Sequence, residues 1–305
     1  MNTSIVLAFL APLFWSLANY VDKFVISKYI KGQNGVGSLV IFTGLTGFIM
    51  SIGVILLGHN PLSLPFINIL WIMLAGAVLV ASFIPYLQAL QIEDSSVVVP
   101  LYQLIPVISY FLALIFLGET LTGQQIVGGI LVIFGAIFIS INLSHKYKLN
   151  FRVLGLMILA SLGVSINALM FKYFSLENSN GWTTAFWEYI GAGIFSVLLW
   201  IFIKQYRQQF NSLLKQNGAV MVGLNVGGEV LNLSAKLLMG FASLGAPLAL
   251  VTIINGVQPL IIFIIGLILT LWMPNIIEEK ITKKYLLQRG FSILVIFVGI
   301  YVLLG

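Results

Sequence analysis

Apolar segments long enough to cross a lipid bilayer recur from one end of this sequence to the other. A run of about 18 or more apolar residues is a candidate transmembrane helix. We predict ten such spans, at residues 4–24, 36–57, 66–89, 96–117, 124–142, 153–174, 182–203, 217–240, 245–272 and 286–304. Only 8% of the 305 residues are charged, whereas soluble domains carry about 25%. The chain is therefore predicted to be an all-α polytopic membrane protein in which residues 1–305 form a single membrane domain.

Short matches between the two halves of the sequence indicate an internal duplication. The pentapeptide ILVIF occurs at residues 130–134 and again at 293–297, and the motif PLYQLIP of the fourth span is matched by TIINGVQP in the ninth. We predict two five-helix repeats within the single domain, at residues 1–147 and 148–305. Because each repeat has an odd number of helices, the second copy would insert in the opposite orientation, as in the inverted repeats of many secondary transporters.

Basic residues are distributed unevenly over the connections between the predicted spans. All Lys and Arg residues except Lys172 and Lys236 fall at the connections after spans one, five, seven and nine. Cytoplasmic loops carry an excess of Lys and Arg, so these connections are predicted to face the cytoplasm and both chain ends the outside. The +6 formal charge is then loop charge that sets orientation, not a nucleic-acid-binding surface. We expect the inner or plasma membrane of a prokaryotic cell as the location.

Residues 95–140, SSVVVPLYQLIPVISYFLALIFLGETLTGQQIVGGILVIFGAIFIS, resemble the EamA-type repeat of the drug/metabolite transporter (DMT) superfamily. The matching features are a proline-bearing helix, a glutamate just past its end (Glu119) and a glycine-containing helix after it. The same order recurs in GAPLALVTIINGVQPLIIFIIGLILTL, followed by Glu278 and Glu279. The resemblance implies alternating access and a central cavity lined mainly by spans one, three, four, six, eight and nine. Members are usually described with both termini in the cytoplasm, opposite to the orientation that the basic residues predict.

Four polar residues interrupt the apolar eighth span at helical spacing. Asn225, Glu229, Asn232 and Lys236 are separated by four, three and four residues, which places them on one face of an α-helix. A charge at the bilayer centre costs about 2.5–3.5 kcal/mol on insertion scales, and such residues normally face a cavity or the protein interior. We therefore predict that this stripe binds substrate. The alternatives are a structural carboxylate paired with a neighbouring lysine and, for Lys236, a side chain that reaches the membrane interface.

Two further charges lie inside predicted spans, in the outer half of the membrane. Glu188 occurs in FWEYIG of the seventh span, and Lys172 lies near the end of the sixth. A Lys172–Glu188 pair is predicted, as a gate that closes the outer side or as structural pairing. Asp22 and Lys23 are interpreted as an interfacial charge pair, and Glu119 as a charge at a helix–loop boundary. Glycine pairs are predicted at close helix contacts: Gly44/Gly47, Gly128/Gly129 and Gly191/Gly193.

Prolines accompany uncharged polar residues in the third, fourth and ninth spans. A proline frees the carbonyl group four residues earlier, and a membrane tolerates this only where protein or cavity water satisfies the carbonyl. These spans are therefore predicted to be cavity walls, together with the first span. The candidate substrate-binding residues of the four spans are Trp15, Asn19, Tyr86, Tyr102, Gln103, Asn255 and Gln258. The alternative for each of them is helix–helix hydrogen bonding or core packing.

Several functions leave sequence motifs that this chain lacks. It has no GxxxxGK[ST] nucleotide-binding loop, no HExxH or GxSxG motif and no cysteine. Its two histidines, His59 and His145, fall in connecting segments. We therefore expect no cofactor, no metal and no nucleic acid. The expected partners are a small-molecule substrate, protons and the lipid bilayer.

We predict a secondary active transporter of a small organic metabolite, not an enzyme. A carboxylate and an ammonium group on one helical face suit a zwitterion, so an amino acid or a related compound is favoured, and Glu229 would bind its ammonium group or take up a proton. The alternative is a proton-coupled exporter of lipophilic cations, for which Trp15, Tyr86 and Tyr102 supply aromatic faces. An intramembrane enzyme or a channel is the alternative of a different class, although the intramembrane charges cluster in the second half.

Overall fold

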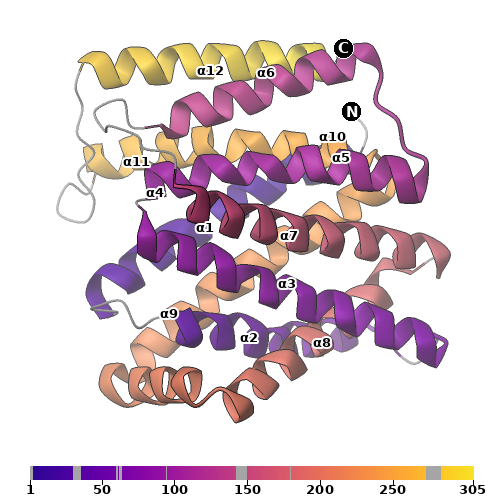
Figure 1. Ribbon diagram of the computed structural model, residues 1–305, viewed down its shortest axis with the longest axis vertical. Coiled ribbons are helices and arrows are strands. Elements are labelled where there is room, and N and C mark those ends of the chain that lie inside the picture. Colours follow the sequence, from indigo (N-terminus) through magenta and orange to yellow (C-terminus); the bar gives the residue numbers. More distant parts are fainter. Residues whose placement is uncertain are drawn as a thin grey trace.

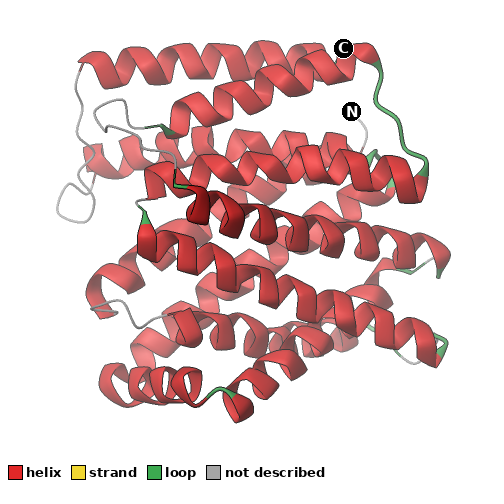
Figure 2. Cartoon of the chain, in the orientation of Figure 1, coloured by secondary structure: helices red, strands yellow, loops and turns green. Residues whose placement is uncertain are grey.

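The computed structural model of the chain describes residues 3–29, 36–59, 61, 64–93, 95–141, 150–178, 180–272 and 283–305. Every regular element among these residues is a helix (Figure 2). The first half contains α1 Thr3–Tyr29, α2 Val36–Leu56, α3 Phe66–Ile92, α4 Ser95–Val98, η1 Val99–Gln103, α5 Leu104–Leu117 and α6 Gly123–Ser140. The second half contains α7 Phe151–Glu177, α8 Gly181–Phe202, α9 Lys204–Leu244, α10 Leu248–Ile254, η2 Asn255–Val257, α11 Gln258–Trp272 and α12 Lys283–Leu304.

The helices follow the predicted spans in order, and the all-helical polytopic fold is confirmed. The fourth predicted span consists of α4, η1 and α5, and the ninth of α10, η2 and α11. Within the described residues, nine segments are long and apolar enough to cross a membrane, one fewer than the ten predicted. The missing segment is α9, the helix of 41 residues that carries the polar stripe. Its polar residues lower its hydropathy, which is why length and composition do not mark it as a span.

The helices form a bundle in which sequence-distant segments lie next to one another (Figure 1). The pair α6 and α12 lies at one end of the long axis, and the pair α2 and α8 lies at the other. Between these pairs, α1 packs against α9, and α3 packs against both α7 and α8. Both chain ends lie toward the same side of the bundle (Figure 1), here called the terminus side. Which side faces the cytoplasm stays a prediction.

Glycines allow the backbones of neighbouring helices to approach closely. A Cβ atom added to Gly44 of α2 would lie 2.6 Å from the carbonyl oxygen of Ala192 in α8. A Cβ atom added to Gly191 of α8 would lie 2.6 Å from the backbone carbonyl carbon of Met73 in α3. Real side chains do not tolerate such separations, so the predicted close-packing role is confirmed for Gly44 and Gly191.

Side-chain caps define where several helices begin. At the start of α6, Thr122 Oγ1 accepts a hydrogen bond from Gln125 N at 3.2 Å, and Gln125 Oε1 accepts one from Thr122 N at 2.9 Å. This reciprocal arrangement satisfies two backbone donors that an uncapped helix would leave unpaired. The side chains of Asn150 and Asn180 cap α7 and α8 in a similar way. These caps fix the helix ends from which the site residues are positioned.

Candidate functional site

The polar stripe of α9 lies on a helix that contacts α1, α2, α7 and α8. Asn225 and Glu229 are buried, with 3% and 8% of their surface exposed. Glu229 Oε1 accepts a hydrogen bond from Thr43 Oγ1 of α2 at 2.7 Å. Asn225 Nδ2 donates to Met221 O, one turn earlier, at 3.2 Å. Both residues therefore lie inside the helix bundle, whereas Asn232 is half-buried and forms no hydrogen bond with any described residue.

Lys236 forms an ion pair with Glu188 of α8, a residue that is only 1% exposed. Glu188 Oε1 also accepts a hydrogen bond from Asn167 Nδ2 of α7, and this Nδ2 donates in addition to Ala75 O of α3 at 2.9 Å. The second carboxylate oxygen of Glu188 accepts no hydrogen bond from the part of the chain that is described. A single series of polar contacts thus joins α9, α8, α7 and α3.

Aromatic rings surround the ammonium group of Lys236. Its Nζ lies 5.1 Å from the ring centroid of Phe171 and 5.7 Å from that of Tyr189, within the range of cation–π attraction. The Tyr189 hydroxyl donates to Leu233 O of α9 at 3.0 Å, which fixes the ring against the same helix. Lys236 therefore points into the bundle and not toward the membrane interface.

The predicted pair between Lys172 and Glu188 is not formed. Lys172 instead makes an ion pair with Glu119, in the turn between α5 and α6, and donates to Ala246 O at 2.8 Å. The two predicted partners face different neighbours: Lys172 faces the turns that precede α6 and α10, and Glu188 faces α9. Lys172 pairs with Glu119 and Glu188 pairs with Lys236, so the prediction of a Lys172–Glu188 pair was wrong.

The fourth and ninth spans change from α-helix to 3₁₀-helix at η1 and η2, shortly before Pro106 and Pro259. Tyr102 of η1 packs against Tyr86 of α3, with ring centroids 4.7 Å apart. In η2, the buried Oδ1 of Asn255 accepts no hydrogen bond from the described residues. Buried polar atoms are normally hydrogen-bonded, so this oxygen is a candidate contact for a ligand.

The first span lies between the stripe and the helix breaks, because α1 packs against both α9 and η2. Asn19 is exposed and its Nδ2 donates to Trp15 O at 2.9 Å, while Ser16 Oγ donates to Gln258 O at 3.5 Å. The side chain of Gln103 reaches η2, where a Cβ atom on Gly256 would lie 3.7 Å from Gln103 Oε1. The predicted residues therefore form two groups, one on α9 and one at the helix breaks, with α1 in contact with both.

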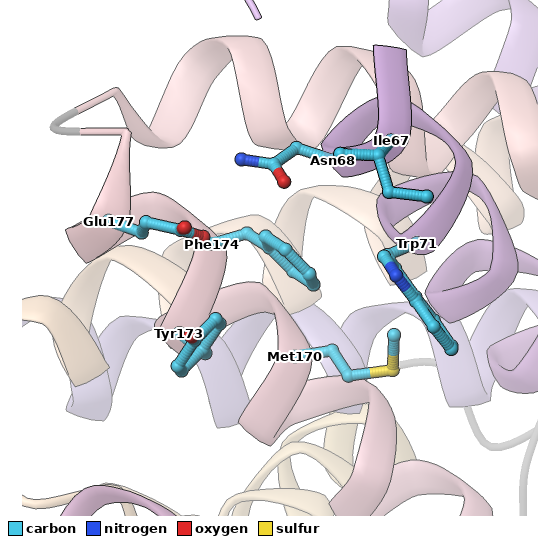
Figure 3. Close-up of a pocket in the computed structure, with 7 residues that line it drawn as sticks. All are labelled: Ile67, Asn68, Trp71, Met170, Tyr173, Phe174 and Glu177. Carbon is cyan, nitrogen blue, oxygen red and sulfur yellow. The ribbon is translucent and has the colours of Figure 1, made fainter. Parts of the chain in front are cut away.

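A pocket of about 280 Å³ opens between the start of α3 and the end of α7 (Figure 3). It is lined by Ile67, Asn68, Trp71, Met170, Tyr173, Phe174 and Glu177. Trp71 and Tyr173 are 49% and 46% exposed, so the pocket is an open groove at the surface. No predicted site residue lines it, and we do not place the substrate there.

Several partners of the predicted residues were not predicted from the sequence. Thr43 and Asn167 lie among other polar residues of apolar spans, and no periodic pattern distinguishes them. Glu119 was interpreted only as a charge at a helix–loop boundary. The predictions that involve His145, Glu278 and Glu279 fall outside the described residues, as do the side chains of Asp22 and Lys23.

Three comparisons relate the chain to known proteins. A sequence model described as the EamA-like transporter family matches residues 2–141. The uncharacterized protein MJ1333.1 of Methanocaldococcus jannaschii is 33% identical over 144 residues, which make up 47% of this chain and 99% of that protein. A protein of known crystal structure superimposes with a TM-score of 0.71 over 98% of this chain and 95% of its own length, at 12% identity. At this identity the likeness to the crystal structure concerns the fold alone.

Proposed function

The chain belongs to the EamA-like transporter family and is therefore a membrane transporter of small molecules; we propose that it moves an amino acid or a related zwitterion by secondary active transport with alternating access. The observation that carries this proposal is the presence of a carboxylate and an ammonium group, Glu229 and Lys236, on one face of α9 inside the bundle. Intramembrane charges of this kind mark substrate or ion pathways.

In this proposal Glu229 binds the ammonium group of the substrate and Lys236 binds its carboxylate. The two residues are two helical turns apart, about 10 Å along the axis. A lysine side chain leans toward the N-terminus of its helix, and thus toward Glu229, which shortens the gap that a solute must bridge. Asn232 lies between them in the sequence and offers an amide with no partner among the described residues.

Lys236 can bind a substrate carboxylate only if it leaves Glu188. Asn167 Nδ2 already donates to Glu188, so Glu188 keeps one hydrogen bond after such an exchange. A zwitterion brings one charge of each sign, and its binding leaves the net charge of the bundle unchanged. A solute with a single negative charge would add to the charges of Glu188 and Glu229 in a medium of low polarity, which is costly. Anions are thus disfavoured, and between zwitterions and cations the carboxylate and ammonium on one face of α9 favour zwitterions.

An inverted pair of repeats, at residues 1–147 and 148–305, is part of the proposal because it provides two related halves that can rock around one site. Three features of the packing support it. The contact of α1 with α9 corresponds, after exchange of the halves, to the contact of α7 with α3, and both occur. The same exchange turns α2 into α8 and α6 into α12, so the contacts of α2 with α8 and of α6 with α12 are each mapped onto themselves. In addition, η1 and η2 interrupt corresponding spans, and such interruptions commonly mark the substrate site of transporters.

The length of the relative from Methanocaldococcus jannaschii also supports a duplication. Almost its whole length matches 47% of this chain, which is close to the share of one predicted repeat. A protein of this size in the same family is consistent with a half-length ancestral unit. The proposed repeats predict that each half of the chain supplies one wall of the transport pathway.

Proton-coupled export of lipophilic cations is the second candidate, and one observation favours it. The rings of Tyr86 and Tyr102 are in contact at 4.7 Å, and Trp15 is half-buried on the neighbouring α1. Aromatic faces of this kind attract cations. Since Lys236 is already paired with Glu188, Glu229 would then act as the anionic group and alternate between a proton and the substrate.

The first experiment measures thermal unfolding of the detergent-purified protein with amino acids and with lipophilic cations. A ligand that binds only the folded state stabilises it by about 2.7 kcal/mol at a hundredfold excess over its dissociation constant. The wild type is compared with Glu229→Gln and with Glu177→Gln, a matched control at an exposed carboxylate. We expect an amino acid to stabilise the wild type and the control but not Glu229→Gln.

The other outcomes discriminate between the candidates. Stabilisation by lipophilic cations alone, lost in Glu229→Gln, supports the second candidate over the first. Equal stabilisation of the wild type and Glu229→Gln by the same compound contradicts a recognition role for Glu229. All comparisons require that the variants elute as a single species and unfold cooperatively without ligand.

A further inference from the structure

Glu119 and Lys172 belong to a ring of four polar groups on the terminus side of the bundle. One oxygen of the Glu119 carboxylate pairs with the Lys172 ammonium group, and the other accepts a hydrogen bond from Leu248 N at 2.7 Å. Lys172 Nζ donates in addition to Ala246 O at 2.8 Å. The ring joins three parts of the chain: the turn between α5 and α6, the helix α7, and the turn between α9 and α10.

The local sequence explains how Glu119 reaches this position. Gly118 ends α5 in the left-handed conformation, with φ of 67°, which glycine adopts with little strain. The chain then reverses, and Glu119 N donates back to Ala113 O at 3.2 Å. The carboxylate is thereby turned toward α7 and α10. Pro247 has no N–H group, so Leu248 N is the first backbone donor of α10, and it donates to the Glu119 carboxylate.

The ring covers an apolar cluster that fills the space between the same elements. Ala113 of α5, Leu169 of α7 and Leu248 of α10 pack together and are 1%, 9% and 1% exposed. The Glu119 side chain is 19% exposed and that of Lys172 4%, so water reaches the ring from one side. If the ring breaks, the Glu119 carboxylate already has an exposed side, which keeps the cost of opening below that of a fully buried pair.

We propose that Glu119, Lys172 and the backbone groups of Ala246 and Leu248 form a latch that holds the terminus side closed and opens in each transport cycle. This inference rests on the proposed alternating-access function. The ring ties the first predicted repeat to the second, and these are the parts that must separate on one side for a solute to pass. A purely structural helix cap would need Glu119 alone, whereas the ring adds a lysine from a third helix.

Cysteine labelling tests the latch, and the chain has no cysteine of its own. Ser165→Cys supplies a reporter that is similar in size to serine. Ser165 is fully buried and hydrogen-bonded to Ser109 Oγ at 3.1 Å, and it lies seven residues before Lys172, about 10 Å deeper along α7. The rate of reaction with a membrane-impermeant charged thiol reagent is measured in proteoliposomes, without substrate.

In this background the latch is weakened by Glu119→Gln together with Lys172→Met. The double change removes both charges, so neither remains buried without its counter-charge. We expect labelling to become faster by about tenfold or more, the factor expected from the loss of charge-assisted hydrogen bonds. Glu177→Gln, at an exposed carboxylate, is the matched control and should leave the rate unchanged. The exchanged pair, Glu119→Lys with Lys172→Glu, restores the ion pair but not the bond to Leu248 N, so an intermediate rate is expected.

An unchanged labelling rate in the double variant, with its fold intact by size exclusion and thermal unfolding, would overturn the latch. If the double variant does not fold, the single change Glu119→Gln is decisive, because it retains the Lys172 bond to Ala246 O. Labelling requires no ligand, so its outcome is independent of the Glu229 experiment. Faster labelling with no stabilising ligand leaves the latch standing and contradicts the proposed substrate class.

Discussion

Replacing Lys236 by methionine separates a structural role of this residue from a role in recognition. Methionine keeps most of the apolar stem between Phe171 and Tyr189 and removes the charge. Glu188, which is 1% exposed, then retains only the hydrogen bond from Asn167 among the described residues. The change leaves a buried carboxylate without its counter-charge.

The expected loss of stability is large. Removing one partner of a buried ion pair costs about 3–5 kcal/mol, whereas replacing both partners by neutral groups is often close to neutral. We therefore expect Lys236→Met to lower the free energy of unfolding by about 3–5 kcal/mol and the double change with Glu188→Gln to recover most of that loss. Glu177→Gln, at an exposed site, should change stability by no more than about 0.5 kcal/mol.

Thermal unfolding of the four proteins, each with and without the stabilising ligand, is the assay. If Lys236 binds the substrate carboxylate, the double variant is stable but shows no ligand-induced shift. A double variant that keeps the full shift contradicts recognition by Lys236 and leaves the pair a structural role. If Lys236→Met alone unfolds at the wild-type temperature, the ion pair stabilises nothing and the exchange mechanism loses its basis.

Two further predictions concern glycines. Gly191→Ala should lower the free energy of unfolding by about 1–3 kcal/mol, because the new Cβ would overlap the backbone of Met73. Gly155→Ala is the control: its Cβ would have nothing within 4 Å, and the change should raise stability by about 0.5–1 kcal/mol. Equal melting temperatures of the two variants would contradict the packing argument. Gly118→Ala should cost about 1–2 kcal/mol at its positive φ and speed labelling at Ser165→Cys, whereas Gly123→Ala, at the start of α6, should do neither.

The order of the membrane helices and most of their limits could be predicted because two signals agree at most boundaries. Apolar runs give the length of a span, and turn residues such as those of GETLTG mark its end. The predicted span 124–142 and the helix α6, Gly123–Ser140, differ by one residue at the start and two at the end. The start of α9 was not predicted, because residues 204–216 are mostly polar and hydropathy marks only the part of a helix that is apolar.

The partners of the charged residues could not be predicted from the sequence. Helical spacing shows that Glu229 and Lys236 share a face of α9, since that relation is local. The pairing of Lys236 with Glu188, and of Lys172 with Glu119, depends on which faces of different helices meet. Glu119 lies outside the apolar run, and nothing in its position along the sequence indicates a contact with a lysine of the sixth span. The reversal of the chain at Gly118 is what turns it toward α7.

A lysine that already has a partner can recognise a substrate only by exchange, and this links substrate binding to helix packing. The contact of Lys236 with Glu188 continues through Asn167 to α7, and Lys172 of the latch lies five residues further along this helix. A ligand shifts a conformational equilibrium only by its difference in affinity for the two states. If α7 moves with its partners, the free energy released when a substrate replaces Glu188 as the partner of Lys236 differs between the closed and the open state. By reciprocity, the factor by which the latch weakens substrate binding must equal the factor by which substrate promotes opening of the latch.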